Sequence, residues 1–518
     1  MTRTAASLPG SSTAASRADC NAPMAGQPFW WRSHLSRPAK PSKPSGGPMT
    51  DTTTPGAGKT LWGHPVGLAV LTGTELWERF SYYGMMGLLT LYMTKQALLP
   101  GHVEHIIGFP GFRAVVEGVF GPLTTLALAS QIFGLYTGFI YATPIVGGLI
   151  GDRLLGQRRT VILGTLLMAG GHILMTFEPF FLLALLLLIL GAGCIKGNMA
   201  VQVGALYGKD DTRRTRAFGI YLIGLNVGAF TAPLIVGTLG EKVAWHWGFG
   251  AAGIGMLISL VIYLLGQKHL PPDTLKAAGS EKAPGLRKGE GRLLAGLMLL
   301  LIPYILVFSA YQQAWNIFMV WADTSVDMTF GAFKAPVTWF ATLDGILTIL
   351  AVFFCVRLWA WQARRGKEPN DVGKISFGMI LGTLSFLFLA GGAFLAGSGL
   401  TAIIFPVLFF VAADLMIPFV DTVTMSAFSR SAPAALGTTM MGIFYLATFV
   451  TNVTVGWLGR FYETLSHAQF WLLHAGLSAA GLLFLILLGK PLTRMLEPIP
   501  FAPTADPPIE ATLGASRG

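Results

Sequence analysis

The sequence is poor in charge and in cysteine. Only 12% of its 518 residues are Asp, Glu, Lys or Arg, whereas 53% are hydrophobic and the mean hydropathy is +0.60. A soluble domain is normally about a quarter charged, so this composition excludes an ordinary soluble protein. The three cysteines, Cys20, Cys194 and Cys355, provide no disulfide framework, because two of them lie inside long apolar runs.

Motifs for catalysis and metal binding are also missing. The sequence contains no HExxH pair, no Walker-type phosphate loop and no set of His and Cys residues at metal-ligand spacing. We therefore expect that the protein is not an enzyme and that it needs no metal or cofactor.

What the chain does contain is long apolar runs. Several of them reach the roughly 20 residues that a helix needs to cross a bilayer. We predict an all-α polytopic membrane protein with twelve transmembrane helices. The expected spans are 66–94, 127–151, 160–178, 180–207, 216–239, 246–266, 292–322, 336–362, 374–396, 400–429, 437–460 and 468–490.

Lys and Arg residues are distributed unevenly between alternate loops. One set of loops carries 19 of them and the other set carries 5. By the positive-inside rule the richer side is cytoplasmic, and so are both termini. This predicts a multi-pass protein of the cell (inner) membrane. The net charge of +11 then reflects topology and contact with the lipid bilayer, and no nucleic-acid partner is expected.

The predicted helices divide six and six around the longest cytoplasmic connection. Two six-helix halves are the arrangement of major-facilitator transporters, whose halves rock around a midplane site. The expected organisation is a disordered segment 1–60, a bundle 61–266, a linker 267–291, a bundle 292–490 and a disordered tail 491–518. Met49 offers an alternative translation start, which would make the residues before it an extension; a transit peptide is the other interpretation.

The turn after the second span reads GGLIGDRLLGQRR, from Gly147 to Arg159. Its glycines allow neighbouring helices to approach closely, and Asp152 is placed to cap the next helix or to pair with a nearby arginine. The order Gly-Asp-Arg-x-x-Gly-x-Arg-Arg resembles the signature loop of major-facilitator proteins. This predicts a gating role for Gly148, Asp152 and Arg153, with a solvated charged turn as the alternative.

Ionisable residues inside the predicted spans are the main functional candidates, because each costs about 2.5–3.5 kcal/mol near a bilayer centre. Glu75 and Arg79 form an i,i+4 pair in the favourable order, and Glu78 lies one turn from Glu75. This cluster must face the bundle interior, where it either acts in transport or only holds helices together. The other candidates are Lys196, Asp344 and Asp414.

Four acids and two bases in one cavity would leave a net charge of −2. Desolvation and repulsion between like charges both favour protonation of at least one carboxyl group. The set therefore predicts proton exchange, and separated positive and negative poles suit a small zwitterion.

Four motifs resemble those of the proton-dependent oligopeptide transporters, a family of the major facilitator superfamily. They are ELWERFSYYG from Glu75 to Gly84, GAGCIKGN around Lys196, LNVG at 225–228 and MMGIFYLATFVTN in the eleventh span. The similarity extends over roughly residues 60–490. It implies a symporter that uses protons to import di- and tripeptides by alternating access.

The resemblance also implies roles for individual residues. It assigns proton coupling to Glu75, Glu78, Arg79, Lys196 and Asp414, and it pairs Lys196 with Asp414. It also implies that Asn226 helps to bind the peptide. The full set of predicted substrate-binding residues is Arg79, Tyr83, Tyr141, Lys196, Asn226, Gln312, Asp344 and Asp414.

The chain departs from the family pattern at several of these positions. Met86 replaces a basic residue, Leu222 a tyrosine, Gln312 an acid, Asp344 an asparagine, Asp414 a glutamate, and Phe308 and Phe444 two tryptophans. We expect Asp344 to bind a substrate ammonium group or to take over part of the proton coupling. A proton-driven exporter of amphipathic or drug-like compounds on the same fold is the main alternative, and a receptor built on this fold is another.

Overall fold

The computed structural model describes residues 60–208, 211–273, 275, 290–433 and 436–497. The predictions for the N-terminal segment, for the start at Met49, for the C-terminal tail and for most of the linker concern residues outside these ranges.

The first half of the chain, called the N-half, folds into a helical bundle in which α1 packs against α6 and α8. Short connections such as a π-helical turn at Pro233–Gly237 join its helices. The helices are α1 (Val66–Tyr92), α2 (Phe109–Phe120), α3 (Thr125–Arg153), α4 (Gln157–Leu174), α5 (Phe181–Ala205), α6 (Arg213–Ala232), α7 (Thr238–Lys242) and α8 (Trp245–Gly266), preceded by a hairpin of β1 (Thr60–Leu61) and β2 (His64–Pro65).

The second half, called the C-half, forms another bundle, in which α12 packs against α13 and α16. Its elements are α9 (Glu290–Tyr311), α10 (Ile317–Ser325), β3 (Thr329–Phe330), β4 (Phe333–Lys334), α11 (Trp339–Arg364), α12 (Asp371–Ala396), α13 (Ile404–Ile417), α14 (Val423–Ser431), α15 (Gly437–Gly459) and α16 (His467–Leu496).

The all-α membrane fold predicted from the sequence is confirmed. Among the described residues, ten helices are long and apolar enough to cross a membrane. Two further helices, α1 and α4, have 27 and 18 residues. These two are less apolar because α1 carries Glu75, Glu78 and Arg79, and α4 begins beside Arg158 and Arg159. They lie in the expected spans 66–94 and 160–178, whereas the ten helices above correspond to the other expected spans.

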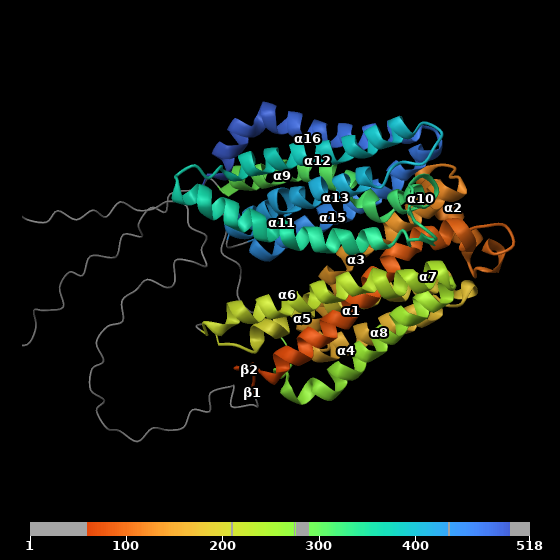
Figure 1. Ribbon diagram of the computed structural model, residues 1–518. Coiled ribbons are helices and arrows are strands. Elements are labelled where there is room, and N and C mark those ends of the chain that lie inside the picture. Colours follow the sequence, from red (N-terminus) through yellow and green to blue (C-terminus); the bar gives the residue numbers. More distant parts are fainter. Residues whose placement is uncertain (1–59, 209–210, 274, 276–289, 434–435, 498–518) are drawn as a thin grey trace, which may run out of the picture.

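The two bundles lie side by side and meet near α7 and α10 (Figure 1). This end of the molecule, which the charge distribution predicts to be external, is called the outer end. Asn316, which is fully buried, joins the halves there: its amide donates to Ser130 Oγ over 2.6 Å and accepts from Thr90 Oγ1 at 3.1 Å. Gly134 of α3 packs so tightly on α15 that an added Cβ would lie 2.5 Å from the Asn452 carbonyl oxygen.

The expected span 292–322 is interrupted at this contact. After α9 the chain makes a short 3-10 turn, Gln312–Trp315, and α10 begins after Asn316, whose φ and ψ are −118° and −104°. The break turns the Asn316 amide away from its own helix and toward the N-half. A polar residue in a membrane helix commonly finds such a partner on a neighbouring helix.

A carboxylate of α7 forms the most completely bonded contact between the halves. Glu241 accepts from the backbone N–H groups of Val337 and Thr338, both over 2.9 Å, and from the Thr338 hydroxyl over 2.6 Å. These groups begin α11, so the carboxylate also lies at the positive end of that helix dipole. We call this contact the outer latch. It joins the two halves at the outer end.

We expect Glu241→Ala to open the outer end. Three hydrogen bonds to one ionised group are lost, each of which normally contributes about 1.5–3 kcal/mol, and about 1.4 kcal/mol already changes a two-state population tenfold. Spin labels on the exposed Val115 and Leu400 should then report a second, longer distance.

Glu117→Gln is the matched control for this experiment. Glu117 also accepts from a side chain and from a backbone N–H, of Arg113 and Leu123, but both lie in the N-half. Its distance distribution should equal that of the wild type. A Glu241→Ala distribution without a longer component would contradict the latch.

Candidate functional site

The charged turn of α1 is folded into the N-half. Arg79 Nε lies 3.0 Å from Glu75 Oε1 and 2.5 Å from Glu78 Oε2, and all three side chains are buried. Tyr221 of α6 donates its hydroxyl to Glu75 Oε2 over 2.7 Å. The predicted i,i+4 pair is present, and a single guanidinium pairs with two carboxylates.

Close packing of α6 on α1 brings Tyr221 to this turn. Gly228 lies against α1, and a Cβ added there would be 2.1 Å from the carbonyl oxygen of Leu76. Only glycine allows two helix backbones to approach so closely. The same approach keeps water away from the Glu75–Arg79 pair.

Lys196 of α5 lies over aromatic rings. Its Nζ is 5.0 Å from the centre of the Tyr82 ring and 4.4 Å from that of Tyr141. Among the described residues no carboxylate lies within ion-pairing distance of this ammonium group. The expected bridge to Asp414 is therefore not formed in this conformation, because Asp414 is held by its own half.

The two acids of the C-half accept hydrogen bonds from hydroxyl groups of their own half. Tyr311 donates to Asp344 Oδ1 over 2.6 Å, and Thr348 donates to Asp414 Oδ1 over 2.6 Å. Asp344 and Asp414 act on each other electrostatically, and both are buried. The six predicted charges thus form two opposed groups, basic and acidic in the N-half and purely acidic in the C-half, instead of one mixed cluster.

Two tyrosines of the N-half lie between these groups. The Tyr83 ring is 5.6 Å from the Trp315 ring of the C-half. The carboxylate of Asp344 acts electrostatically on Tyr83, and that of Asp421 acts on Tyr141. Tyr83 and Tyr141 are both half-buried, so the site joins polar groups of the two halves.

The two predicted amide residues are less central than expected. Asn226 is half-buried and donates to the carbonyl oxygen of Leu222 in its own helix over 2.7 Å. Gln312 donates to Asn452 Oδ1 over 3.4 Å within the C-half. The side-chain amide of each residue therefore hydrogen-bonds within its own half.

The turn between α3 and α4 contains the predicted gating residues. A Cβ added at Gly147 would lie 2.0 Å from the Gly193 carbonyl oxygen, and one at Gly151 would lie 2.1 Å from Asn198 Oδ1. Gly148 has open space around it, so close packing depends on its neighbours. Asp152 is half-buried and Arg153 is exposed.

Two polar residues at or near the site, Tyr221 and Asp421, were not predicted from the sequence. Leu222, at the position of the family tyrosine, is 52% exposed, and the phenol of α6 comes instead from the preceding residue, Tyr221. Asp421 lies in the π-helical turn Pro418–Thr422 after α13, and its Oδ1 accepts from the Tyr304 hydroxyl over 3.1 Å. Its spacing of seven residues from Asp414, two helical turns, was the available signal.

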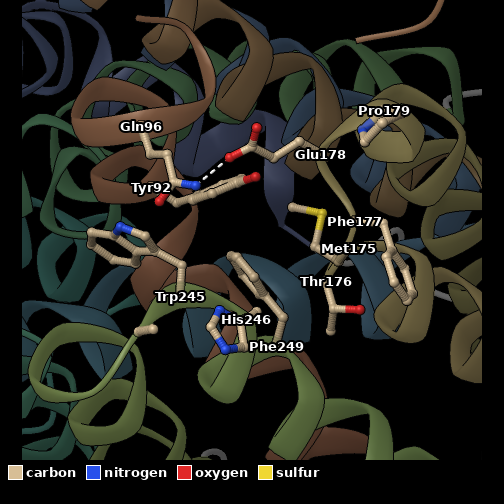
Figure 2. A pocket seen from close by; sticks show the side chains of 11 residues that line it. Tyr92, Gln96, Met175, Thr176, Phe177, Glu178, Pro179, Trp245, His246 and Phe249 are labelled. Carbon is tan, nitrogen blue, oxygen red and sulfur yellow. Dashed lines mark hydrogen bonds between the residues drawn. The ribbon is translucent and has the colours of Figure 1, made fainter. Parts of the chain in front are cut away.

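A cavity of about 390 Å³ lies at the outer end of the N-half, between the α4–α5 connection and the start of α8 (Figure 2). The charged residues described above do not contribute to its lining, which includes Tyr92, Glu178 and Trp245. Glu178 accepts from Gln96 and makes a 2.9 Å contact with His102 Nδ1. His102 of this outer loop is thus bound to the Glu178 carboxylate.

Comparison with known proteins identifies the family. The model of the POT family matches residues 158–278 and 287–472, which is more than half of the chain. The chain belongs to the POT family. It is therefore a multi-pass membrane transporter and not an enzyme, as expected from the sequence.

Relatives resemble this POT-family chain over nearly their whole length. A di-/tripeptide transporter of Lactococcus lactis subsp. cremoris is 28% identical over 509 residues, covering 85% of this chain and 98% of the relative. The uncharacterized transporter YclF of Bacillus subtilis (strain 168) is 27% identical, with coverages of 85% and 95%. A crystal structure of a mutant peptide transporter POT in complex with alafosfalin matches with a TM-score of 0.75 at 25% identity, covering 86% and 98%.

Proposed function

We propose that this transporter is a proton-coupled symporter that imports di- and tripeptides by alternating access. The observation that carries the proposal is the opposition of charges across the two halves. Lys196 of the N-half has no carboxylate partner among the described residues, whereas Asp344 and Asp414 of the C-half have no cation. A peptide carries a carboxylate and an ammonium group, so it bridges the two poles and draws the halves together.

The acidic pair of the C-half supplies the proton site. Two buried carboxylates that act on each other repel when both are ionised, so Asp344 and Asp414 together favour a proton on one of them. Substrate ammonium competes with this proton for Asp344. On the cytoplasmic side the proton leaves, and Asp414 becomes available to Lys196 when the halves rock.

The α1 cluster has a second role in the same cycle. Arg79 pairs with both Glu75 and Glu78 but compensates only one of the two charges, so the cluster carries a net negative charge beside Lys196 when all groups are ionised. A proton taken up here removes that excess. Coupling then involves Glu75, Glu78, Arg79, Lys196 and Asp414, and the turn with Gly148, Asp152 and Arg153 serves as a gate at the cytoplasmic end.

Similarity supports the choice of peptide as substrate. The Lactococcus relative is named a di-/tripeptide transporter, and a Yersinia enterocolitica relative with 27% identity is named a peptide transporter. The topology deduced from the Lys and Arg distribution completes the proposal, with a location in the inner membrane and both termini in the cytoplasm.

Counterflow in proteoliposomes tests this function. Vesicles loaded with unlabelled dialanine should accumulate labelled dialanine, and external di- and tripeptides should compete, whereas single amino acids and drug-like cations should not. With an inward proton gradient, labelled peptide should accumulate inside. Net export of drug-like cations under the same gradient would favour the exporter, and binding without flux would indicate a receptor.

Asp344→Asn should change both substrate affinity and pH dependence. The variant restores an uncharged amide, which cannot hold a proton with Asp414 or attract an ammonium group as a carboxylate does. Loss of a charge-assisted hydrogen bond, normally about 1.5–3 kcal/mol, should raise the KM for dialanine about tenfold or more. The pH profile of uptake should shift as well, as measured from initial rates.

Asp211→Asn is the control for Asp344→Asn. Asp211 pairs with Arg213, two residues along the N-half, over 2.8 Å and is partly exposed, so the KM and pH profile of this variant should remain those of the wild type. An unchanged substrate preference and pH profile in Asp344→Asn would disprove the role of Asp344.

A further inference from the structure

Asp421 is an acid of the C-half that the proposed cycle does not use. It follows Asp414 by seven residues, about 10 Å along a helix, and it is half-buried. Among the described residues no Lys, Arg or His side chain lies within ion-pairing distance of it. Tyr304 donates to one of its oxygens over 3.1 Å.

An aromatic wall begins at this carboxylate. The Tyr304 ring is 4.6 Å from the Phe308 ring and 5.0 Å from the Phe444 ring. Tyr445, next to Phe444, is within electrostatic range of Asp421, and so is Tyr141 of the N-half. Rings beside a carboxylate suit a long cationic side chain, because the stem packs on the rings while the charged end binds the acid.

The spacing fits a second positive charge on the same substrate. A dipeptide backbone extends about 7 Å, and a Lys or Arg side chain adds the rest of the distance from the Asp344–Asp414 pair to Asp421. The peptide carboxylate and the backbone ammonium group already engage Lys196 and the acidic pair. Asp421 has neither a second acid beside it, as Asp344 and Asp414 have, nor a described base. An additional cation on the substrate would neutralise its charge.

We infer that Asp421 and Tyr304 form a subsite for a cationic side chain of the substrate, with Phe308 and Phe444 as its wall. The inference rests on the proposed peptide transport and adds a substrate class to it. The transporter then prefers dipeptides that carry a Lys or Arg residue over neutral dipeptides of similar size, and it disfavours those with an acidic side chain.

Initial uptake rates in proteoliposomes test this subsite with alanyl-lysine, dialanine and alanyl-glutamate as probes. The wild type should show a KM for alanyl-lysine about tenfold below that for dialanine, the effect of one charge-assisted hydrogen bond. Asp421→Asn should remove that difference while the KM and kcat for dialanine change by less than about twofold. Asp421→Glu should restore part of the preference for alanyl-lysine.

Asp327→Asn is the matched control, because Asp327 is an exposed acid at the outer end that binds the backbone N–H of Thr329. It should keep the wild-type preference. Equal KM values for alanyl-lysine and dialanine in the wild type, or an undiminished preference in Asp421→Asn, would overturn the subsite. Loss of all peptide uptake in a folded Asp421→Asn would also overturn it, since Asp421 would then serve every substrate. Absence of uptake of any peptide by the wild type would instead reject the proposed function.

Discussion

Replacing Lys196 by alanine is expected to reduce dialanine uptake about a hundredfold without unfolding the protein. Its ammonium group lies over the Tyr82 and Tyr141 rings and has no carboxylate partner among the described residues, so its charge is available to the substrate carboxylate. A charge-assisted hydrogen bond of up to about 3 kcal/mol corresponds to such a factor. Gradient-driven uptake and counterflow should both fall, because the same contact serves both.

Lys374→Ala provides a close control for this prediction. The Lys374 ammonium group also lies over an indole ring, that of Trp359, at 4.7 Å, and it pairs with Glu368 within the C-half. Lys374 makes the same kind of contact as Lys196 but lies elsewhere in the fold. Dialanine uptake by the Lys374→Ala variant should therefore stay within about twofold of the wild type. Equal uptake by Lys196→Ala and Lys374→Ala would remove Lys196 from the site.

Arg79→Met is expected to destabilise the protein strongly and to abolish uptake. The guanidinium is the counter-charge of both Glu75 and Glu78. Removing one partner of a buried ion pair typically costs about 3–5 kcal/mol, because an uncompensated charge stays behind. The thermal unfolding midpoint in detergent and the initial uptake rate should both fall.

Two further variants separate stability from transport at Arg79. Adding Glu75→Gln and Glu78→Gln to Arg79→Met removes the unpaired charges, so the unfolding midpoint should recover while uptake stays absent. Arg113→Met breaks an exposed i,i+4 pair on α2 and should lower stability by no more than about 1 kcal/mol. A stable and active Arg79→Met would mean that the cluster has neither role.

The sequence allows the helices and the local charge pair to be predicted, because both depend on neighbours along the chain. Apolar runs indicate membrane helices without reference to the rest of the fold. The Glu75–Arg79 pair follows from the helical repeat alone. The interruption at Asn316 was missed, since it depends on partners in the N-half, Ser130 and Thr90.

Contacts between helices were harder to predict. Leu222 and Tyr221 are adjacent, but one residue turns a side chain by about 100° around a helix, and this decides which of them reaches Glu75. For the same reason the sequence does not show that Gly147 and Gly151 pack closely against a neighbouring helix whereas Gly148 has open space around it. Whether Lys196 and Asp414 form a bridge depends on how the two halves are arranged. A pattern of neighbouring residues in the sequence does not contain that information.

Asp421 was overlooked for a different reason. It lies inside the expected span 400–429, but Asp414 was the only ionisable candidate taken from that span. A search by helical period would have found it, because a residue seven positions after Asp414 lies on nearly the same face of a helix. With Asp421 included, the spans of the C-half contain a third acid, and no described base of that half pairs with any of the three.

The most direct test of the account measures protons and peptide together. Proteoliposomes that contain the transporter and an internal pH-sensitive dye should acidify when dialanine is added outside at equal pH on both sides, and vesicles with Lys196→Ala should not. Entry of labelled dialanine without any change in internal pH would show that peptide moves alone, and it would contradict coupling between the two opposed groups of charges.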